Sequence, residues 1–217
     1  SEDVAHGFSL GGVDYVVKPF KGVELRARVR NHLELYAYRA NLERLVEERT
    51  TEAELLKDVI IEAMGEMAEY RDPETGSHIH RTREYVLLLA ETLASRGHFT
   101  ATLTPDYITL LHKSAPLHDI GKVAIRDSIL LKPGKLTAEE FEEMKAHTLF
   151  GEEAIANLEQ MAGHPTSFLS CAKEIAGSHH EKFDGSGYPR GLAGEAIPLG
   201  GRIMAVADVY DALISKR

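Results

Sequence analysis

The stretch SHIHRTREYVLLLAETLASR, residues 77–96, has the pattern that most of the chain repeats. Its apolar residues recur every three or four positions, as in an α-helix that buries one face, and it contains no proline or glycine. Stretches of the same kind follow along the chain. We therefore predict a mainly α protein, with helices in its body over residues 77–96, 105–115, 138–146, 148–161, 168–178 and 199–215.

Capping residues indicate where two of these helices begin. Thr104 stands directly before Pro105, and Thr137 is followed three residues later by Glu140, which is the spacing of a capping box. Residues 183–198, in contrast, are rich in glycine and proline and lack the periodicity of a helix or a strand. We expect this last segment to be a loop.

The first 70 residues have a different organisation. Val13–Val17 is a short run typical of a strand, and Lys18-Pro19-Phe20 follows it directly. A helical pattern without proline then covers residues 22–48 and 50–70. We expect these two stretches to link the start of the chain to its helical body.

Apolar residues over part of this linking segment follow a heptad spacing. Three charged residues, Arg49, Glu52 and Glu66, interrupt the seam. Two interpretations stay open: a coiled coil, or two helices that pack on their own domain with a joint near Arg49–Glu52. The apolar heptad positions are Leu35, Tyr38, Leu42, Leu45, Leu56, Val59 and Ala63.

The composition excludes several classes of protein. The longest apolar run, residues 85–90, is far shorter than the about 20 residues that cross a bilayer, so we expect no membrane span and a cytoplasmic location. Cys171 is the only cysteine, so no internal disulfide can form, and we expect a buried, inert thiol. The net charge of −9 argues against binding of long nucleic acid. A small phosphate ester could still bind if metal ions and local basic residues supply positive charge.

The 11 histidines suggest where such ions would bind. Glu74 and His78 are four apart, and Asp208 lies in an apolar run where a buried carboxylate is costly unless it is paired or metal-bound. Each feature alone is weak, and a helix register that turns Asp208 to solvent is the alternative. Together with these residues, the candidate ligands are His118, Asp119, His147, His179 and His180.

The segments that carry these residues resemble the HD-GYP phosphodiesterases of the HD superfamily. The glycine-tyrosine-proline triplet that names that family is Gly187, Tyr188 and Pro189. The resemblance runs from about Asp72 to Arg217. It rests on RDPETGSH at 71–78, HDIGK at 118–122, His147 with Gly151, HHEKFDGSGYP at 179–189 and VADVYDAL at 206–213.

The resemblance implies an all-α HD-type helical bundle that holds two or three transition-metal ions. Asp119 would bridge two ions, and Glu74 matches a ligand of a third. Lys122 matches the lysine that contacts the substrate phosphate, and Tyr188 and Arg217 match positions that also reach the substrate. Imidazole and carboxylate ligands suit iron or manganese, which we expect first, with nickel or zinc as alternatives. The implied metal ligands are His78, His118, Asp119, His147, His179, His180 and Asp208, besides Glu74.

The implied reaction is hydrolysis of cyclic di-GMP to linear pGpG, GMP or both. Two ions about 3.5–4 Å apart can hold a bridging hydroxide that attacks phosphorus in line. Lys122 would stabilise the developing charge; its alternative role is that of a solvated surface lysine. Other functions stay open: hydrolysis of cyclic GMP-AMP or of the linear dinucleotide, or a catalytically weak scaffold that docks a diguanylate cyclase.

Residues 10–35 resemble the last strand and last helix of a response-regulator receiver domain. This implies a small α/β fragment at 1–35, a helical linker at 36–70 that could form a homodimer, and an HD-GYP domain at 71–217 that is incomplete at its C-terminal end. Lys18 would sense the phosphoryl group, and the Lys18-Pro19 peptide bond would be cis. The phosphate-accepting aspartate would lie upstream, and its phosphorylation would control the metal site through the linking helix.

Overall fold

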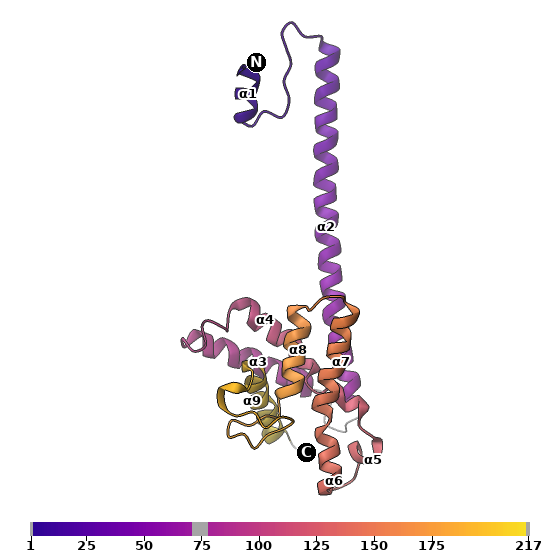
Figure 1. Cartoon of the computed structure of the whole chain (residues 1–217). Helices are drawn as coiled ribbons and strands as arrows, with labels where there is room; N and C mark the ends of the chain where they lie inside the picture. The colour runs from indigo at the N-terminus through magenta and orange to yellow at the C-terminus, as the bar shows by residue number, and fades with distance from the viewer. Residues whose placement is uncertain (1, 71–77, 216–217) are drawn as a thin grey trace. The chain divides into compact units, whose positions relative to one another are not determined.

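The computed structural model of the chain describes residues 2–70 and 78–215 (Figure 1). Their contacts divide the chain into two units, Ser1–Leu55 and Leu56–Arg217. Helices and connecting turns make up both units, and residues 2–70 and 78–215 contain no strand beyond one isolated bridge between Asp184 and Ala193. The prediction of a mainly helical protein is confirmed. Among the described helices, none combines the length and apolar character that crossing a membrane requires.

The first unit contains a correction to the sequence prediction. After helix α1 (Glu2–Ser9), the run Val13–Val17 has no regular secondary structure and forms no strand. A strand needs a neighbour to pair its backbone N–H and C=O groups, and the helices of this unit use theirs internally. The expected α/β character of the N-terminal fragment is therefore not found in the described residues. The Lys18-Pro19 peptide bond is cis, as predicted.

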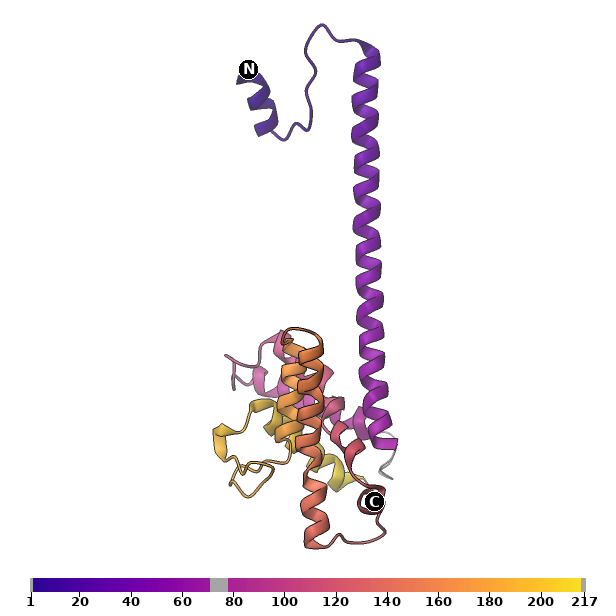
Figure 2. The same ribbon diagram turned by 45° about the vertical axis from the view of Figure 1, so that its right-hand side comes forward.

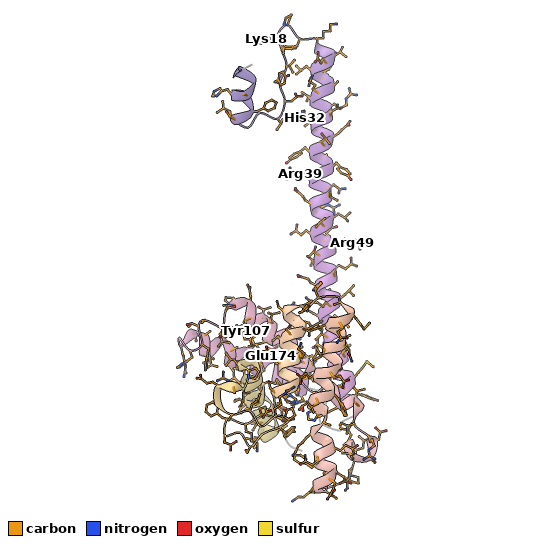
Figure 3. All side chains as sticks on the ribbon, in the orientation of Figure 1. Lys18, His32, Arg39, Arg49, Tyr107 and Glu174 are labelled. Atoms are coloured by element: carbon orange, nitrogen blue, oxygen red, sulfur yellow. The ribbon has the colours of Figure 1, made fainter. Side chains whose placement is uncertain are left out.

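Side chains hold this segment against the following helix. Asp14 accepts hydrogen bonds from the Arg28 guanidinium at 3.0 and 3.2 Å, and its Oδ2 lies 3.3 Å from His32 Nε2. Figure 3 shows His32 beside the segment and Lys18 on the turn that enters the helix. The rings of Phe8 and Tyr15 meet edge to face, with centroids 6.0 Å apart. Most of these groups are exposed, so each contact stabilises the segment only slightly.

Helix α2 runs without a break from Gly22 to Tyr70, so the alternative of two helices with a joint near Arg49–Glu52 is wrong (Figure 2). Its 49 residues correspond to about 73 Å at the 1.5 Å rise of an α-helix. Ion pairs between successive turns join Arg39 to Glu43 and Arg44 to Glu48, and each stabilises a helix by a few tenths of a kcal/mol. Arg49 and Glu52, where that alternative placed the joint, form another such pair, 2.6 Å apart. Figure 3 shows Arg39 and Arg49 on the uninterrupted helix.

The second unit is a bundle of short helices, and the six predicted for the body lie within one residue of the observed bounds. The two capping predictions are also confirmed: Thr104 accepts from the Tyr107 N–H, and Thr137 and Glu140 form a capping box. The helices are α3 (His78–Ser95), α4 (Pro105–Ser114), η1 (Ala115–Leu117), η2 (Ile120–Ala124), α5 (Asp127–Leu130), α6 (Ala138–Lys145), α7 (His147–Met161), α8 (Ser167–Ser178), η3 (Gly194–Ala196) and α9 (Leu199–Ile214).

The core of this unit lies between α3, α4, α8 and α9. Leu111, Ile175 and Met204 are fully buried there, and Cys171 is buried as predicted. A smaller cluster around Ile155 joins α7 to α8, which pack along each other. The ends of α3, α7 and α8, the turn between η1 and η2, and the middle of α9 are thereby held together. These are the places where the candidate ligands occur.

Candidate metal centre

Imidazoles and a carboxylate from four parts of the second unit converge into two overlapping groups. Atoms of Asp119, His147, His179 and His180 that could bind a metal all lie within 4.8 Å of one another. Atoms of His78, His118 and Asp119 form the second group by the same measure. Asp119, in the turn between η1 and η2, belongs to both groups. The structure thus brings six of the candidate side chains from the sequence analysis together.

Asp208 lies beside the second group. Its Oδ1 is 3.4 Å from His78 Nε2, and its side chain is 20% exposed. The register of α9 thus turns the carboxylate towards the cluster, and the alternative that it faces solvent is wrong.

Backbone carbonyls fix the orientation of three of the imidazole rings. His118 Nδ1 lies 2.9 Å from the Ala115 carbonyl, His147 Nδ1 lies 2.7 Å from that of Met144, and His179 Nδ1 lies 3.1 Å from two carbonyls of α8. A carbonyl only accepts, so in each neutral ring Nδ1 carries the hydrogen and Nε2 keeps its lone pair. Such bonds are the usual orienting contacts behind metal-bound histidines.

The atoms that point into the cluster have no hydrogen bonds. The Nε2 atoms of His118, His147 and His179, and Oδ1 of Asp119, are buried and without a hydrogen-bond partner. They lie 3.2–3.5 Å from atoms of opposite polarity, but without the alignment of a hydrogen bond. Leaving buried polar atoms unpaired is costly, and a divalent cation would satisfy these lone pairs together. The chain therefore has a histidine and aspartate cluster that fits metal ions.

The charges of the cluster are unevenly distributed. Burial favours a neutral Asp119, but Lys122 and His118 hold the pKa of this carboxyl well below its usual range. Burial also opposes protonation of His118, yet the neighbouring Asp119 raises the pKa of His118 to about 9. Burial lowers the pKa of His179 and of His180. These last two imidazoles are therefore neutral, which is the form that binds metal.

Lys122 is part of this charge arrangement. Its Nζ lies 2.8 Å from Asp119 Oδ2, and its side chain is only 13% exposed. The alternative of a solvated surface lysine is therefore wrong. The ammonium therefore lies beside the carboxylate that the two groups share.

Glycine is required where η2 approaches α7. A Cβ atom at Gly121 would lie 1.9 Å from the carbonyl oxygen of His147 and 2.4 Å from the backbone N of Gly151. The absence of a side chain lets the turn that carries His118 and Asp119 contact the first turn of α7. The glycine of HDIGK thus sets the spacing of the two overlapping groups.

The loop after α8 folds back over the cluster. Buried Glu181 accepts from two backbone N–H groups of the loop, those of Arg190 at 2.7 Å and Leu192 at 2.9 Å. Gly187 is needed here, because a Cβ atom would lie 2.3 Å from the backbone N of Lys182. The Tyr188 ring is consequently held 4.8 Å from the ring of His180. Burial raises the pKa of Tyr188, so its hydroxyl remains protonated.

Comparison with known proteins agrees with this geometry. Residues 62–217 match the family described as the HD domain. The chain belongs to the HD domain family.

Curated relatives of this HD domain chain are longer proteins. A probable cyclic di-GMP phosphodiesterase of Vibrio cholerae is 49% identical over all of this chain and 51% of its own length. The cyclic di-GMP phosphodiesterase response regulator RpfG of Xanthomonas campestris is 41% identical over 95% of this chain and 53% of its own. A 3'3'-cGAMP-specific phosphodiesterase 2 of Vibrio cholerae is 39% identical over 95% of this chain and 37% of its own length. The chain thus spans about half, or less, of the length of these relatives.

Two predicted site residues of the HD domain, Glu74 and Arg217, lie outside the described residues. Gly187, Tyr188 and Pro189 are all described, and the Tyr188-Pro189 peptide bond is cis.

Sequence analysis missed three buried carboxylates near the cluster. Glu181 holds the loop, and Asp211 contacts His78 from behind. Glu69, on the last turn of α2, is 7% exposed, and burial raises its pKa. The spacing of Asp208 and Asp211, three apart on one helix face, was a signal that could have revealed Asp211. Nothing in the local pattern distinguishes Glu69 or Glu181 from surface acids.

Proposed function

We propose that this HD domain hydrolyses a cyclic dinucleotide, with cyclic di-GMP as the first candidate and linear pGpG, GMP or both as products. The observation that carries the proposal is the cluster of buried, unpartnered imidazole nitrogens around one shared carboxylate, Asp119. The printed names of the relatives support the substrate class. Two overlapping groups of ligands suit a pair of ions acting on one phosphodiester.

The ligands would divide between two ions that share Asp119. When bound, such ions supply an activated water at neutral pH and polarise the phosphoryl oxygens. Iron or manganese suits the mixed imidazole and carboxylate donors, with nickel and zinc as alternatives. No thiolate competes, because Cys171 lies in the core between α4 and α8. One ion would be held by His147, His179 and His180, the other by His78, His118 and Asp208, with Glu74 as a ligand for a third.

The remaining side chains would bind and orient the substrate. The Lys122 ammonium, beside Asp119, is placed to contact a phosphate oxygen and to balance the charge that develops on it. The Tyr188 hydroxyl is protonated and can donate a hydrogen bond to the substrate. Arg217 is proposed as a further contact. Glu181 acts on none of these atoms directly but holds the loop that carries Tyr188.

Elemental analysis and turnover of cyclic di-GMP before and after chelation test the proposal. We expect at least two transition-metal ions per chain, loss of turnover on chelation and its return with iron or manganese. Lys122→Met should keep the ions and lower turnover roughly 10²–10³-fold, the typical effect of removing one charge-stabilising donor. Lys113→Met is the matched control, because Lys113 pairs with Asp58 on α2, outside the cluster. A metal-loaded chain that leaves cyclic dinucleotides intact would refute the function.

A second substrate, cyclic GMP-AMP, is favoured by the similarity to a 3'3'-cGAMP-specific relative. Parallel assays on cyclic di-GMP, cyclic GMP-AMP and linear pGpG would rank the three by kcat/KM. Tight binding without turnover would instead support the catalytically weak scaffold that docks a diguanylate cyclase.

We also propose that a receiver domain regulates this HD domain. The name of the relative RpfG includes response regulator, and residues 10–35 resemble the end of a receiver domain. The proposed organisation is a receiver end at 1–35, a linker at 36–70 and an HD-GYP domain at 71–217. Equal turnover, with and without a phosphoryl mimic, of a chain that includes a complete receiver domain would contradict this regulation.

We also propose that α2 forms a homodimer. Leu35, Tyr38, Leu42 and Leu45 are 42–69% exposed on one heptad face of a helix, although such residues are normally buried. Light scattering should show a dimer, and replacing Leu42 and Leu45 by glutamate should give monomers. A wild-type monomer at all concentrations would refute this assembly.

A further inference from the structure

His78 differs from three other histidines of the cluster in the group behind its ring. The Nδ1 atoms of His118, His147 and His179 lie against backbone carbonyls. His78 Nδ1 instead lies 2.8 Å from Oδ2 of Asp211, a carboxylate 133 residues further along the chain. The partner of His78 is therefore charged and belongs to a side chain.

Asp211 is itself held rigidly. It is 2% exposed, and Arg81 donates to both of its oxygens, from Nε at 2.6 Å and from Nη2 at 2.9 Å. Arg81 Nη2 also donates to the Ser215 hydroxyl at 3.0 Å. This two-point contact fixes the carboxylate plane, because a guanidinium and a carboxylate match in geometry. Arg81 and His78 both come from α3, so the contact also fastens α3 to α9.

This contact determines which nitrogen of His78 faces the cluster. An ionised carboxylate only accepts, so His78 Nδ1 must carry the hydrogen. Nε2 is then left towards Asp208, 3.4 Å away. A carboxylate behind a metal-bound imidazole also makes the ring a stronger electron donor than a carbonyl does, and such partners change metal affinity about 10–100-fold when they are removed.

We propose that Asp211, held by Arg81, is the positioning residue for His78, and that it makes the two metal positions unequal in how they are retained. The proposal rests on the metal centre of the proposed function. It assigns Asp211 to the ion near His78, His118 and Asp208 alone. The rings of His147 and His179 are oriented by main-chain carbonyls instead, so the ion near His147, His179 and His180 should not respond to a change at residue 211.

The test counts the ions retained per chain at graded chelator concentrations, which requires no substrate. We expect Asp211→Ala to lose one ion at a chelator concentration about 10–100-fold lower than the wild type does, while the second ion is retained as before. Asp211→Asn should lose this ion at a chelator concentration between those of the wild type and Asp211→Ala. Its amide oxygen can still accept from His78 Nδ1 but carries no charge. Asp211→Asn also serves if the alanine variant does not fold, as judged by circular dichroism.

Two backgrounds show whether the effect passes through His78. Adding Asp211→Ala to His78→Ala should not lower the chelator concentration at which ions are lost. Adding it to His147→Ala should lower that concentration as much as it does in the wild type. Glu159→Gln is the matched control. Like Asp211, the Glu159 carboxylate is largely buried and pairs with a cation, here Lys173, but it lies between α7 and α8, outside the cluster. It should leave both ions in place.

Several results would overturn the inference. These are equal weakening of both ions by Asp211→Ala, unchanged release of both, an undiminished effect in the His78→Ala background, or a wild-type chain that holds no ion. Failure of the proposed function is a different result, namely normal ion counts without hydrolysis of any cyclic dinucleotide.

Discussion

Burial decides which side chains of this chain can react. The single thiol, Cys171, lies 4% exposed in the core formed by α3, α4, α8 and α9. Burial raises the pKa of this thiol to about 11. Because the pKa is raised, the thiol is neutral at every pH below about 11 and becomes a nucleophilic thiolate only above it.

Native Cys171 should therefore react slowly with a disulfide reagent at pH 8. A shift of about two pKa units reduces the thiolate about hundredfold, before restricted access slows the reaction further. Absorbance of the released thiolate follows the rate, and the urea-unfolded chain supplies the reference. Equal rates in the native and unfolded chains would show that the thiol is not buried.

Gly121 is the residue at which a single methyl group should do most damage. Gly121→Ala would place Cβ against backbone atoms of His147 and Gly151, which cannot move without shifting α7. Overpacking of this kind costs about 1–3 kcal/mol, and we expect a loss at the upper end together with weaker metal retention. Urea unfolding and elemental analysis measure the two effects.

Gly22→Ala is the control for this change. At Gly22 the added carbon meets only a flexible end of Arg26, at 3.5 Å, so neither stability nor metal content should fall. A harmless Gly121→Ala would contradict the close approach of η2 to α7.

At the scale of elements, periodicity predicted the long helices well and the short turns poorly. The helices of the body are amphipathic over several turns, so their spacing is visible in the sequence. Residues 115–130 form η1, η2 and α5, which are too short to repeat a pattern, yet they carry His118, Asp119 and Lys122. The prediction of a strand at Val13–Val17 was wrong because a strand depends on a pairing partner that the local sequence does not specify.

The candidate site shows the same limit. Candidate ligands that are adjacent or closely spaced in the sequence could be recognised from their residue types. The structure brings those of the described residues together. Which ring nitrogen points inward depends on carbonyls three or four residues away in a folded turn, and on Asp211 across the bundle. These contacts exist only after helices far apart in sequence have packed.

The loop over the cluster provides a prediction at this scale. Glu181→Gln should loosen residues 184–193, because the amide has one accepting oxygen for two backbone donors, and an unpaired buried donor costs about 1–3 kcal/mol. Hydrogen exchange of the Arg190 and Leu192 amides should become faster.

Glu195→Gln is the matched control for the loop, because Glu195 is exposed in η3, directly after residues 184–193. Unchanged exchange in Glu181→Gln, or equal acceleration in both variants, would show that Glu181 does not hold the loop.

For the whole molecule, the metal centre should stabilise one of the two units. Every described candidate ligand lies within Leu56–Arg217, and none lies within Ser1–Leu55. Ions that bind only the folded form stabilise it, by about 2.7 kcal/mol at one hundred times the dissociation constant.

Chelation should accordingly lower the Tm of the second unit by roughly 5–10 °C, taking about 2–4 °C per kcal/mol for a domain of this size. Calorimetry with and without metal measures the shift, and ellipticity of a peptide covering residues 22–55 should not respond to metal. An unchanged Tm of the larger unit would indicate that the buried imidazoles do not hold ions in solution.

The hydrogen bonds that His118, His147 and His179 donate to main-chain carbonyls have a consequence for how this protein can change over generations. Every amino acid has a carbonyl, so substitutions at Ala115, Met144 or Ile175 that preserve the turn leave those three rings facing the same way. At His78 the corresponding anchor is encoded by one codon, that of Asp211. Substitutions at the carbonyl-bearing positions can thus accumulate without reorienting His118, His147 or His179. A single nucleotide change in the codon of Asp211, in contrast, can remove the group that orients His78.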